Sequence, residues 1–220
     1  MHLNKIDNKM RLIMTTPSII VLKINADPPH AGIACLVKFL LQDYASRQPQ
    51  VHTIVSGTPP SGYPPFVAST EQRVHMATLF AARSSWGKRG FILDTTSEAT
   101  TNARSMFDIV TTLQKQHDAP VVWCAGIDAL HHDWAFQDHR DDLLQLPGVV
   151  FHRKGYQELK IPEQENIQVF DLSQILDRAP GAISGKGLRE TRKKTRSGGC
   201  LTHAVNVDVK MYIHREKLYL

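Results

Sequence analysis

Six short runs of apolar residues, most of them rich in β-branched side chains, recur along the chain. Runs of this length that are bounded by turn-forming residues predict buried strands. They cover residues 18–24, 51–56, 91–93, 120–125, 149–151 and 167–170.

Helices are predicted between and after these runs, most clearly where apolar residues recur at helical spacing. They cover residues 32–41, a stretch starting at Glu71, and residues 106–113, 187–196 and 204–216. Strands that alternate with helices predict an α/β protein with a Rossmann-like, mostly parallel sheet, helices on both faces and right-handed crossovers. We expect a loose leader over residues 1–17 and a single domain over residues 18–220.

The loop after the first predicted strand, residues 25–33, carries the first candidate chemistry. Ligands of such folds bind beyond the carboxyl ends of the strands, where loops open into helix N-termini. His30 and Gly32 would lie at such an N-terminus, where backbone N–H groups and the helix dipole favour anions and glycine permits close approach. The alternative is a proline-rich turn with a solvated histidine.

Two later segments also have the composition of a phosphate-binding site. Gly126 and Asp128 directly follow the fourth predicted strand. Residues 183–189 open a predicted helix and place Lys186 and Arg189 near its start. Cations at that end oppose the helix dipole, which indicates that an anion lies between them.

In order along the chain, these segments resemble the motifs of the nicotinate- and nicotinamide-nucleotide adenylyltransferases, a branch of the HxGH nucleotidyltransferases. KINADPPHAGI is similar to the family's GGSFDPxHxGH loop, GIDAL to GxDxL, VVFHRKGY to VVxRPGY, and ISGKGLR to ISSTxIR. The segment with Glu71, Gln72, Arg73 and Met76 is similar to SxxxRxxM, and VKMYIHREKLY to the tail VxxYIxxxxLY. The resemblance spans residues 18 to 219 and implies a nucleotidyltransferase-type fold.

Several positions depart from the family pattern. Ile33 stands where HxGH has its second histidine, and Lys23 and Ile24 replace the two glycines of the opening loop. Lys186 replaces the threonine of ISSTxIR, and the lysine that follows the prolines of the second loop is missing. Losing one transition-state hydrogen-bond donor typically costs on the order of 10²–10³ in rate. Lys23 or Lys186 would offer a compensating point charge.

The resemblance implies a reaction of NAD biosynthesis in which a nicotinate or nicotinamide mononucleotide attacks the α-phosphorus of ATP and releases pyrophosphate. Catalysis would rest on positioning and on stabilising phosphate charge. It implies that His30 is the catalytic donor and that Trp134 stacks on the pyridine ring. The ATP-binding residues that it implies are Asp27, Gly32, Gly126, Asp128, Ser184, Lys186 and Arg189. Mg²⁺ would arrive with ATP rather than in a protein cage. A nucleotide-binding pseudoenzyme is the alternative.

The composition fits an ordinary globular chain, with 42% hydrophobic and 21% charged residues. We expect no membrane partner, because the sequence holds no apolar stretch of spanning length and no apolar core of a secretory signal. Cys35, Cys124 and Cys200 are too widely spaced for a disulfide framework or a zinc ribbon, so a cytoplasmic location is expected. The sequence leaves the oligomeric state open, with a homodimer among the options.

The net charge of +5 is a local feature, because most of the excess lies in residues 186–196. A basic run can contact RNA, so an RNA-binding protein is a second alternative. This run has no interleaved aromatic residues and follows the candidate phosphate motif. We therefore expect it to be a solvated helix face and expect no nucleic-acid partner.

Residues 131–142 (HHDWAFQDHRDD) are dense in histidines and carboxylates, which raises the alternative of a metal-dependent hydrolase. Their spacing fits no helical zinc motif, since His132 and His139 are seven residues apart. A solvated helix without bound metal is the favoured interpretation of this segment.

Overall fold

The computed structural model describes residues 19–42, 49–57, 59, 65–82, 87–94, 105–152, 158–160, 164–172, 188–189 and 205–219. The strands of this part of the chain are β1 (Ile19–Ile24), β2 (Gln50–Val55), β3 (Phe91–Asp94), β4 (Val121–Gly126), β5 (Gly148–His152) and β6 (Ile167–Asp171). They form one sheet in the order β3-β2-β1-β4-β5-β6, and every neighbouring pair is parallel. Each strand begins and ends within one residue of its predicted bounds, so the predicted parallel sheet is confirmed.

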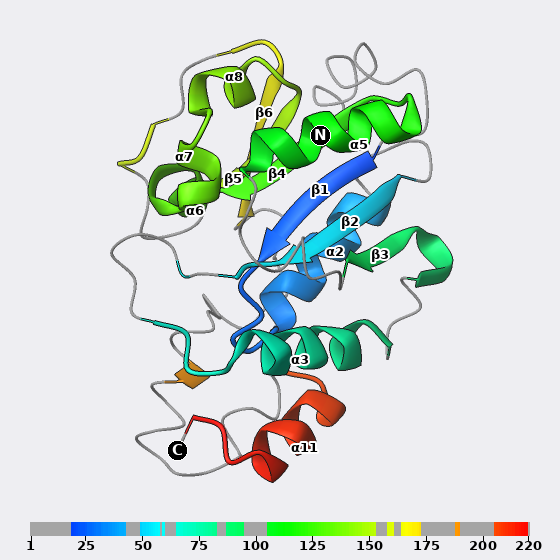
Figure 1. Cartoon of the computed structure of the whole chain (residues 1–220), viewed down its shortest axis with the longest axis vertical. Coiled ribbons are helices and arrows are strands. Elements are labelled where there is room, and N and C mark those ends of the chain that lie inside the picture. The colour runs from blue at the N-terminus through cyan, green and yellow to red at the C-terminus, as the bar shows by residue number, and fades with distance from the viewer. Residues whose placement is uncertain are drawn as a thin grey trace, which may run out of the picture.

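The sheet is covered by helices on both faces, as predicted. Successive side chains of a strand point to opposite faces, and β1 follows this rule: Ile20 and Leu22 pack in one buried cluster, Ile19 and Val21 in the other. The first cluster includes residues of α2 (Ala31–Gln42) and the second includes residues of α5 (Met106–His117). Figure 1 shows α5 on the viewer's side of the sheet and α2 behind it.

Helix α3 (Thr70–Ala82) begins with a reciprocal cap at Ser69. The Gln72 N–H donates to Ser69 Oγ at 3.3 Å, and the Ser69 N–H donates to Gln72 Oε1 at 2.9 Å. This capping box satisfies two of the N–H groups that a helix start leaves without helical partners. A short 3-10 helix, η2 (Gly87–Arg89), then precedes β3.

The last helix, α11 (Val207–Arg215), packs against α3 at the end of the molecule away from α8 (Arg140–Leu144) (Figure 1). It begins three residues later than predicted because Asn206 caps it, accepting a 2.9 Å hydrogen bond from the Val209 N–H. Met76 and Phe80 of α3 share a third buried cluster with Val209 of α11.

The prediction of one solvated helix over residues 131–142 is wrong. The segment is divided among α6 (Ile127–His132), α7 (Trp134–Gln137) and α8, which begins at Arg140. Asp133 has an extended conformation that ends α6, and His139 has a left-handed conformation with φ 54° that precedes α8. Ala135 and Phe136 are buried, so the segment is also part of the core.

The predicted leader and most of the predicted helix over residues 187–196 lie outside the described residues. Of that helix, the structure describes Leu188 and Arg189. None of the helices among the described residues combines the length and the apolar character needed to cross a membrane.

Candidate functional site

The candidate site lies where β1 and β4 end, at the middle of the sheet. Leu22 of β1 lies opposite Cys124 of β4, and the two strands run in the same direction. The strand order extends from β1 to β2 and β3 on one side and from β4 to β5 and β6 on the other. Such a switch point is where open α/β sheets usually bind ligands. His30 and Asp128, which follow β1 and β4, therefore lie at the same edge, as predicted.

The loop after β1 is buried and leads directly into α2. Ala26 adopts φ 52°, a left-handed conformation that residues with a side chain seldom adopt. Asp27 is buried, and His30 is partly buried. The His30 carbonyl accepts the N–H groups of Ile33 at 2.9 Å and Ala34 at 3.2 Å, so His30 precedes the first turn of α2. The alternative of a merely solvated turn does not fit this burial.

The Asp27 carboxylate joins three segments that are far apart in the sequence. It accepts the Tyr219 hydroxyl at 2.7 Å and the backbone N–H groups of Val67 and Ala68 at 3.2 and 3.3 Å. It also lies 3.1 Å from the Arg189 guanidinium, which in addition donates to the Asp27 carbonyl. The Asp27 side chain has no exposed surface. Its role toward ATP stays a prediction, and the described geometry would let it act through Arg189.

The phenol of Tyr219 remains a hydrogen-bond donor in this arrangement. Burial raises its pKa well above the ordinary value, and the negative charge of Asp27 raises it further. The phenol is therefore neutral over the physiological pH range and holds its proton for Asp27.

Arg73 of α3 holds together the two loops that follow β1 and β2. Its guanidinium donates to the carbonyls of Asn25 at 3.1 Å and Gly57 at 3.2 Å, and to the carbonyl of Ser56. These carbonyls belong to the segments that follow β1 and β2. The guanidinium also lies 4.0 Å from the centre of the Phe66 ring. Arg73 is 1% exposed, and this burial lowers its pKa, with the charge of Asp27 acting in the opposite direction.

Gly126 and Asp128 lie where β4 passes into α6. Gly126 is the residue before the first helical turn, and no side chain caps it. A Cβ atom at Gly126 would lie 2.7 Å from Asp128 Oδ1. The absence of a side chain therefore leaves room for the Asp128 carboxylate at this edge. Both residues were predicted to bind ATP, and that role stays a prediction.

Lys23 is engaged inside the protein. Its ammonium lies 2.8 and 3.0 Å from the two carboxylate oxygens of Asp133, and the two side chains are 5% and 7% exposed. Burial lowers the Lys23 pKa, and the charge of Asp133 opposes that shift. The ammonium is directed to Asp133 rather than to an open phosphate site, which is not the geometry that we expected for a compensating charge.

The structure describes some of the remaining predicted site residues and not others. Trp134 begins α7 and is 46% exposed, so its ring is accessible. Gly32 lies in the first turn of α2. Ser184 and Lys186 lie outside the described residues. Ile33 is partly buried and packs against two buried clusters, one under α2 and the other between α3 and α11.

The contacts of two residues in this region, Tyr219 and Asp133, were not predicted from the sequence. Tyr219 stands in the tail motif, but the sequence does not indicate that its hydroxyl reaches Asp27. The sequence pattern indicates no particular role for Asp133, although aspartate is a common N-cap residue. Its extended conformation and its hydrogen bond from the Ala135 N–H confirm that role in the structure.

The strand order and the switch point define a Rossmann-like α/β fold with a parallel sheet. The chain is similar in structure to nicotinic acid mononucleotide adenylyltransferase of Plasmodium falciparum complexed with NaAD, with a TM-score of 0.68 and 15% identity. The alignment covers 93% of this chain and 98% of that chain. A structure of that enzyme complexed with APC gives a TM-score of 0.66 and 16% identity, with the same coverage.

A putative nicotinate-nucleotide adenylyltransferase from Vibrio parahaemolyticus has a TM-score of 0.52 and 12% identity over 93% of this chain and 96% of that chain. At the level of sequence, no protein-family model and no curated protein matches the chain. The structural neighbours support the resemblance to the adenylyltransferases at the level of the fold.

Proposed function

We propose that the protein transfers the adenylyl group of ATP to a pyridine mononucleotide. The observation that carries the proposal is that two candidate loops follow neighbouring parallel strands at the switch point of the sheet, with His30 before α2 and Asp128 in the first turn of α6. In the reaction, a 5′-phosphate oxygen of the mononucleotide bonds to the α-phosphorus while the bond to the leaving pyrophosphate breaks. Such a reaction needs positioning and charge stabilisation rather than a covalent intermediate.

Each described site residue has a role that fits its surroundings. His30, at the start of α2, would donate to an α-phosphate oxygen, where the helix dipole also favours negative charge. Arg189, oriented by Asp27, would hold the β,γ end of ATP, and Asp128 a ribose hydroxyl or the adenine. Trp134, exposed on α7, would stack on the pyridine ring.

Mg²⁺ would be held chiefly by the phosphates of ATP. Among the described residues, no group of three or more histidine, cysteine, aspartate or glutamate side chains gathers closely enough to hold a metal. Mg²⁺ commonly binds through substrate phosphates and one or two carboxylates, and this chemistry is the reason for proposing an ion that comes with ATP.

The test is a direct assay of the purified protein with ATP, Mg²⁺ and either nicotinate or nicotinamide mononucleotide. We expect the dinucleotide and an equal amount of pyrophosphate from at least one of the two. Binding of ATP without any dinucleotide would overturn the enzyme proposal in favour of a nucleotide-binding pseudoenzyme. Absence of ATP binding would overturn the whole functional class. The cytoplasmic location stays a prediction.

Replacing Arg189 with alanine should weaken ATP binding by about tenfold or more and mononucleotide binding much less, because a charged hydrogen bond to the triphosphate contributes roughly 1.5–3 kcal/mol. Calorimetric titration with each nucleotide measures the difference. Arg215→Ala is a matched control, since this last residue of α11 has a side chain that is 69% exposed and pairs with the next residue, Glu216. Equal ATP affinity in wild type and Arg189→Ala would refute the assignment.

Replacing Ile33 with histidine tests whether the missing donor limits catalysis. If it does, kcat should rise by about 10-fold or more while the ATP dissociation constant stays nearly unchanged, because the gain falls on the transition state. Ile33 packs against two apolar clusters, so Ile33→Asn serves as a polar control without imidazole. A wild-type kcat within the ordinary range of enzymes, about 1–10³ per second, with no gain in Ile33→His, would make the second histidine dispensable.

A further inference from the structure

A buried ion pair joins β1 to the junction between α6 and α7. Lys23 lies near the carboxyl end of β1, and Asp133 lies 110 residues later in the chain. Their charged groups are within 2.8 Å, and both side chains are less than one-tenth exposed. The pair therefore lies close to the carboxyl ends of the strands, where the candidate site is located.

Asp133 fixes the ends of two helices at once. Its N–H donates to the Ala129 carbonyl at 2.8 Å and closes α6. One of its carboxylate oxygens accepts the Ala135 N–H at 3.0 Å and caps α7. Its own carbonyl accepts the Phe136 N–H at 2.9 Å. The path of the chain between the two helices thus depends on where Asp133 is held.

Trp134 follows Asp133 directly and differs from its neighbours in exposure. Asp133, Ala135 and Phe136 are 5%, 2% and 1% exposed, whereas Trp134 is 46% exposed. Packing therefore constrains the Trp134 side chain less than it constrains those of its neighbours. Its backbone lies between Asp133 and the buried Ala135 and Phe136. Phe136 packs in the cluster on this face of the sheet, and the Lys23–Asp133 pair adds a direct polar link from β1 to the residue next to Trp134.

Stability alone does not explain a pair of this kind. The cost of removing two charges from water can exceed their mutual attraction, so an apolar pair of similar volume is often as stable. What an ion pair adds is geometry, because the ammonium donates to both carboxylate oxygens and fixes the distance between strand and junction.

We propose that Lys23 and Asp133 are a positioning pair that sets where Trp134 stands in the mononucleotide part of the site. They do not contact the substrate themselves. The inference deepens the proposed function and rests on it for the identity of the ligand, but not for the position of Trp134.

The test uses Lys23→Met, Asp133→Asn and the double variant that carries both changes. Asparagine keeps an oxygen that can cap α7, and methionine keeps most of the lysine volume. Each single change leaves a buried charge without its partner and should lower the melting temperature, whereas the double variant should recover much of the loss. Lys38→Met on α2 and Asp142→Asn on α8 are matched surface controls, since Lys38 is exposed and the Asp142 side chain is 64% exposed.

The first readout is independent of any nucleotide. The fluorescence of Trp134 is obtained as the difference between each protein and the same protein with Trp134→Phe. In the double variant we expect lower anisotropy and stronger acrylamide quenching of Trp134 than in wild type, despite the recovered stability. An unchanged Trp134 signal in the double variant would overturn the inference and leave the pair a purely structural one.

The second readout is affinity for each nucleotide. The double variant should bind the mononucleotide on the order of tenfold or more weakly, since small misplacements of a binding group are costly, and ATP within about twofold of wild type. Equal losses for both nucleotides would contradict a role confined to Trp134. If wild type binds no pyridine mononucleotide, the proposed function fails, and the fluorescence readout still decides the positioning role.

Discussion

Replacing Arg73 with methionine should lower the free energy of unfolding by about 3 kcal/mol or more. The guanidinium is buried and donates to the carbonyls of Asn25, Ser56 and Gly57, and to the Thr70 hydroxyl. Without it, the buried Ser56 carbonyl and the partly buried carbonyls of Asn25 and Gly57 lose their donor, and each unsatisfied buried group costs roughly 1–3 kcal/mol. Urea unfolding followed by circular dichroism measures the change. Because the three carbonyls follow β1 and β2, nucleotide binding should weaken too.

The matched control for this prediction is Arg140→Met. Within the part of the chain that the structure describes, the hydrogen bonds of the Arg140 guanidinium are long, at 3.5 Å, and go to the Leu130 carbonyl and the Gln137 side chain. Its replacement should change stability by less than about 1 kcal/mol. An equal loss in the two variants would mean that the hydrogen bonds of Arg73 do not stabilise the loops.

Replacing Asp27 with asparagine should cost about 2–4 kcal/mol of stability, because it removes the charged partner of Arg189 from a buried site. The asparagine is almost the same size, so no cavity forms. The loss combines the charge with the acceptor oxygen that the amide NH2 replaces. ATP affinity should fall in the same variant, since Arg189 is no longer held in place. Thermal unfolding and calorimetric titration with ATP measure the two effects.

Two comparisons separate the contacts of Asp27. Tyr219→Phe removes one hydrogen bond but no charge, so its cost should be about 1 kcal/mol, with ATP affinity little changed. Asp142→Asn removes a carboxylate from an exposed pair with His139 at 3.5 Å and should be nearly neutral. Normal ATP binding by Asp27→Asn would contradict the positioning of Arg189 by Asp27.

The strands were predictable because each is a short run rich in apolar residues, and this pattern depends only on neighbouring residues. The same local view failed over residues 131–142, where polar composition suggested a single solvated helix. There the backbone conformations of Asp133 and His139 divide the segment, and the buried contacts of Ala135 and Phe136 outweigh the polar neighbours.

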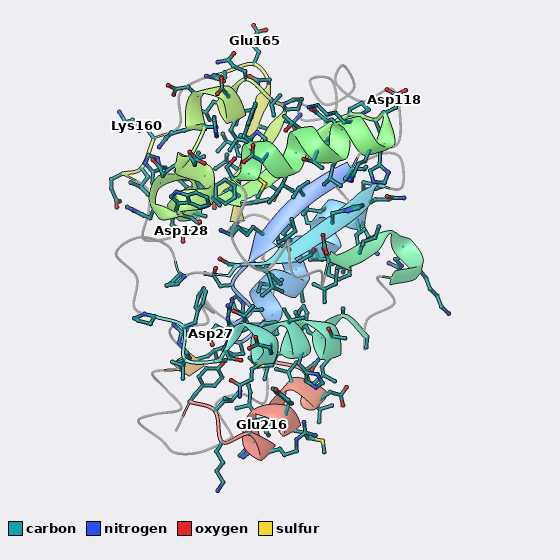
Figure 2. The ribbon with its side chains drawn as sticks, in the orientation of Figure 1. Asp27, Asp118, Asp128, Lys160, Glu165 and Glu216 are labelled. Atoms are coloured by element: carbon teal, nitrogen blue, oxygen red, sulfur yellow. The ribbon has the colours of Figure 1, made fainter. Side chains whose placement is uncertain are left out.

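The site was predictable in its location and less so in its contacts. The position of His30 and Asp128 at one edge follows from parallel strands. The pairs that fix the site could not be predicted from local pattern, because they join residues far apart: Lys23 to Asp133, and Asp27 to Arg189 and Tyr219. Figure 2 shows Asp27 in the lower half of the molecule, near α3, and Asp128 above it on α6.

The contacts of Asp27 also bear on the order in which the protein folds. Tyr219 lies 192 residues after Asp27, and Arg189 lies 162 residues after it. When β1, α2 and β2 have been synthesised, the chain does not yet contain Arg189 and Tyr219, which pair with this carboxylate. Contacts of such separation form late, because a long loop must close before they contribute. In refolding, the contacts of Asp27 with Arg189 and Tyr219 should therefore form after the pairing of β1 with β2, whose partners Ile19 and Gln50 are much closer in sequence.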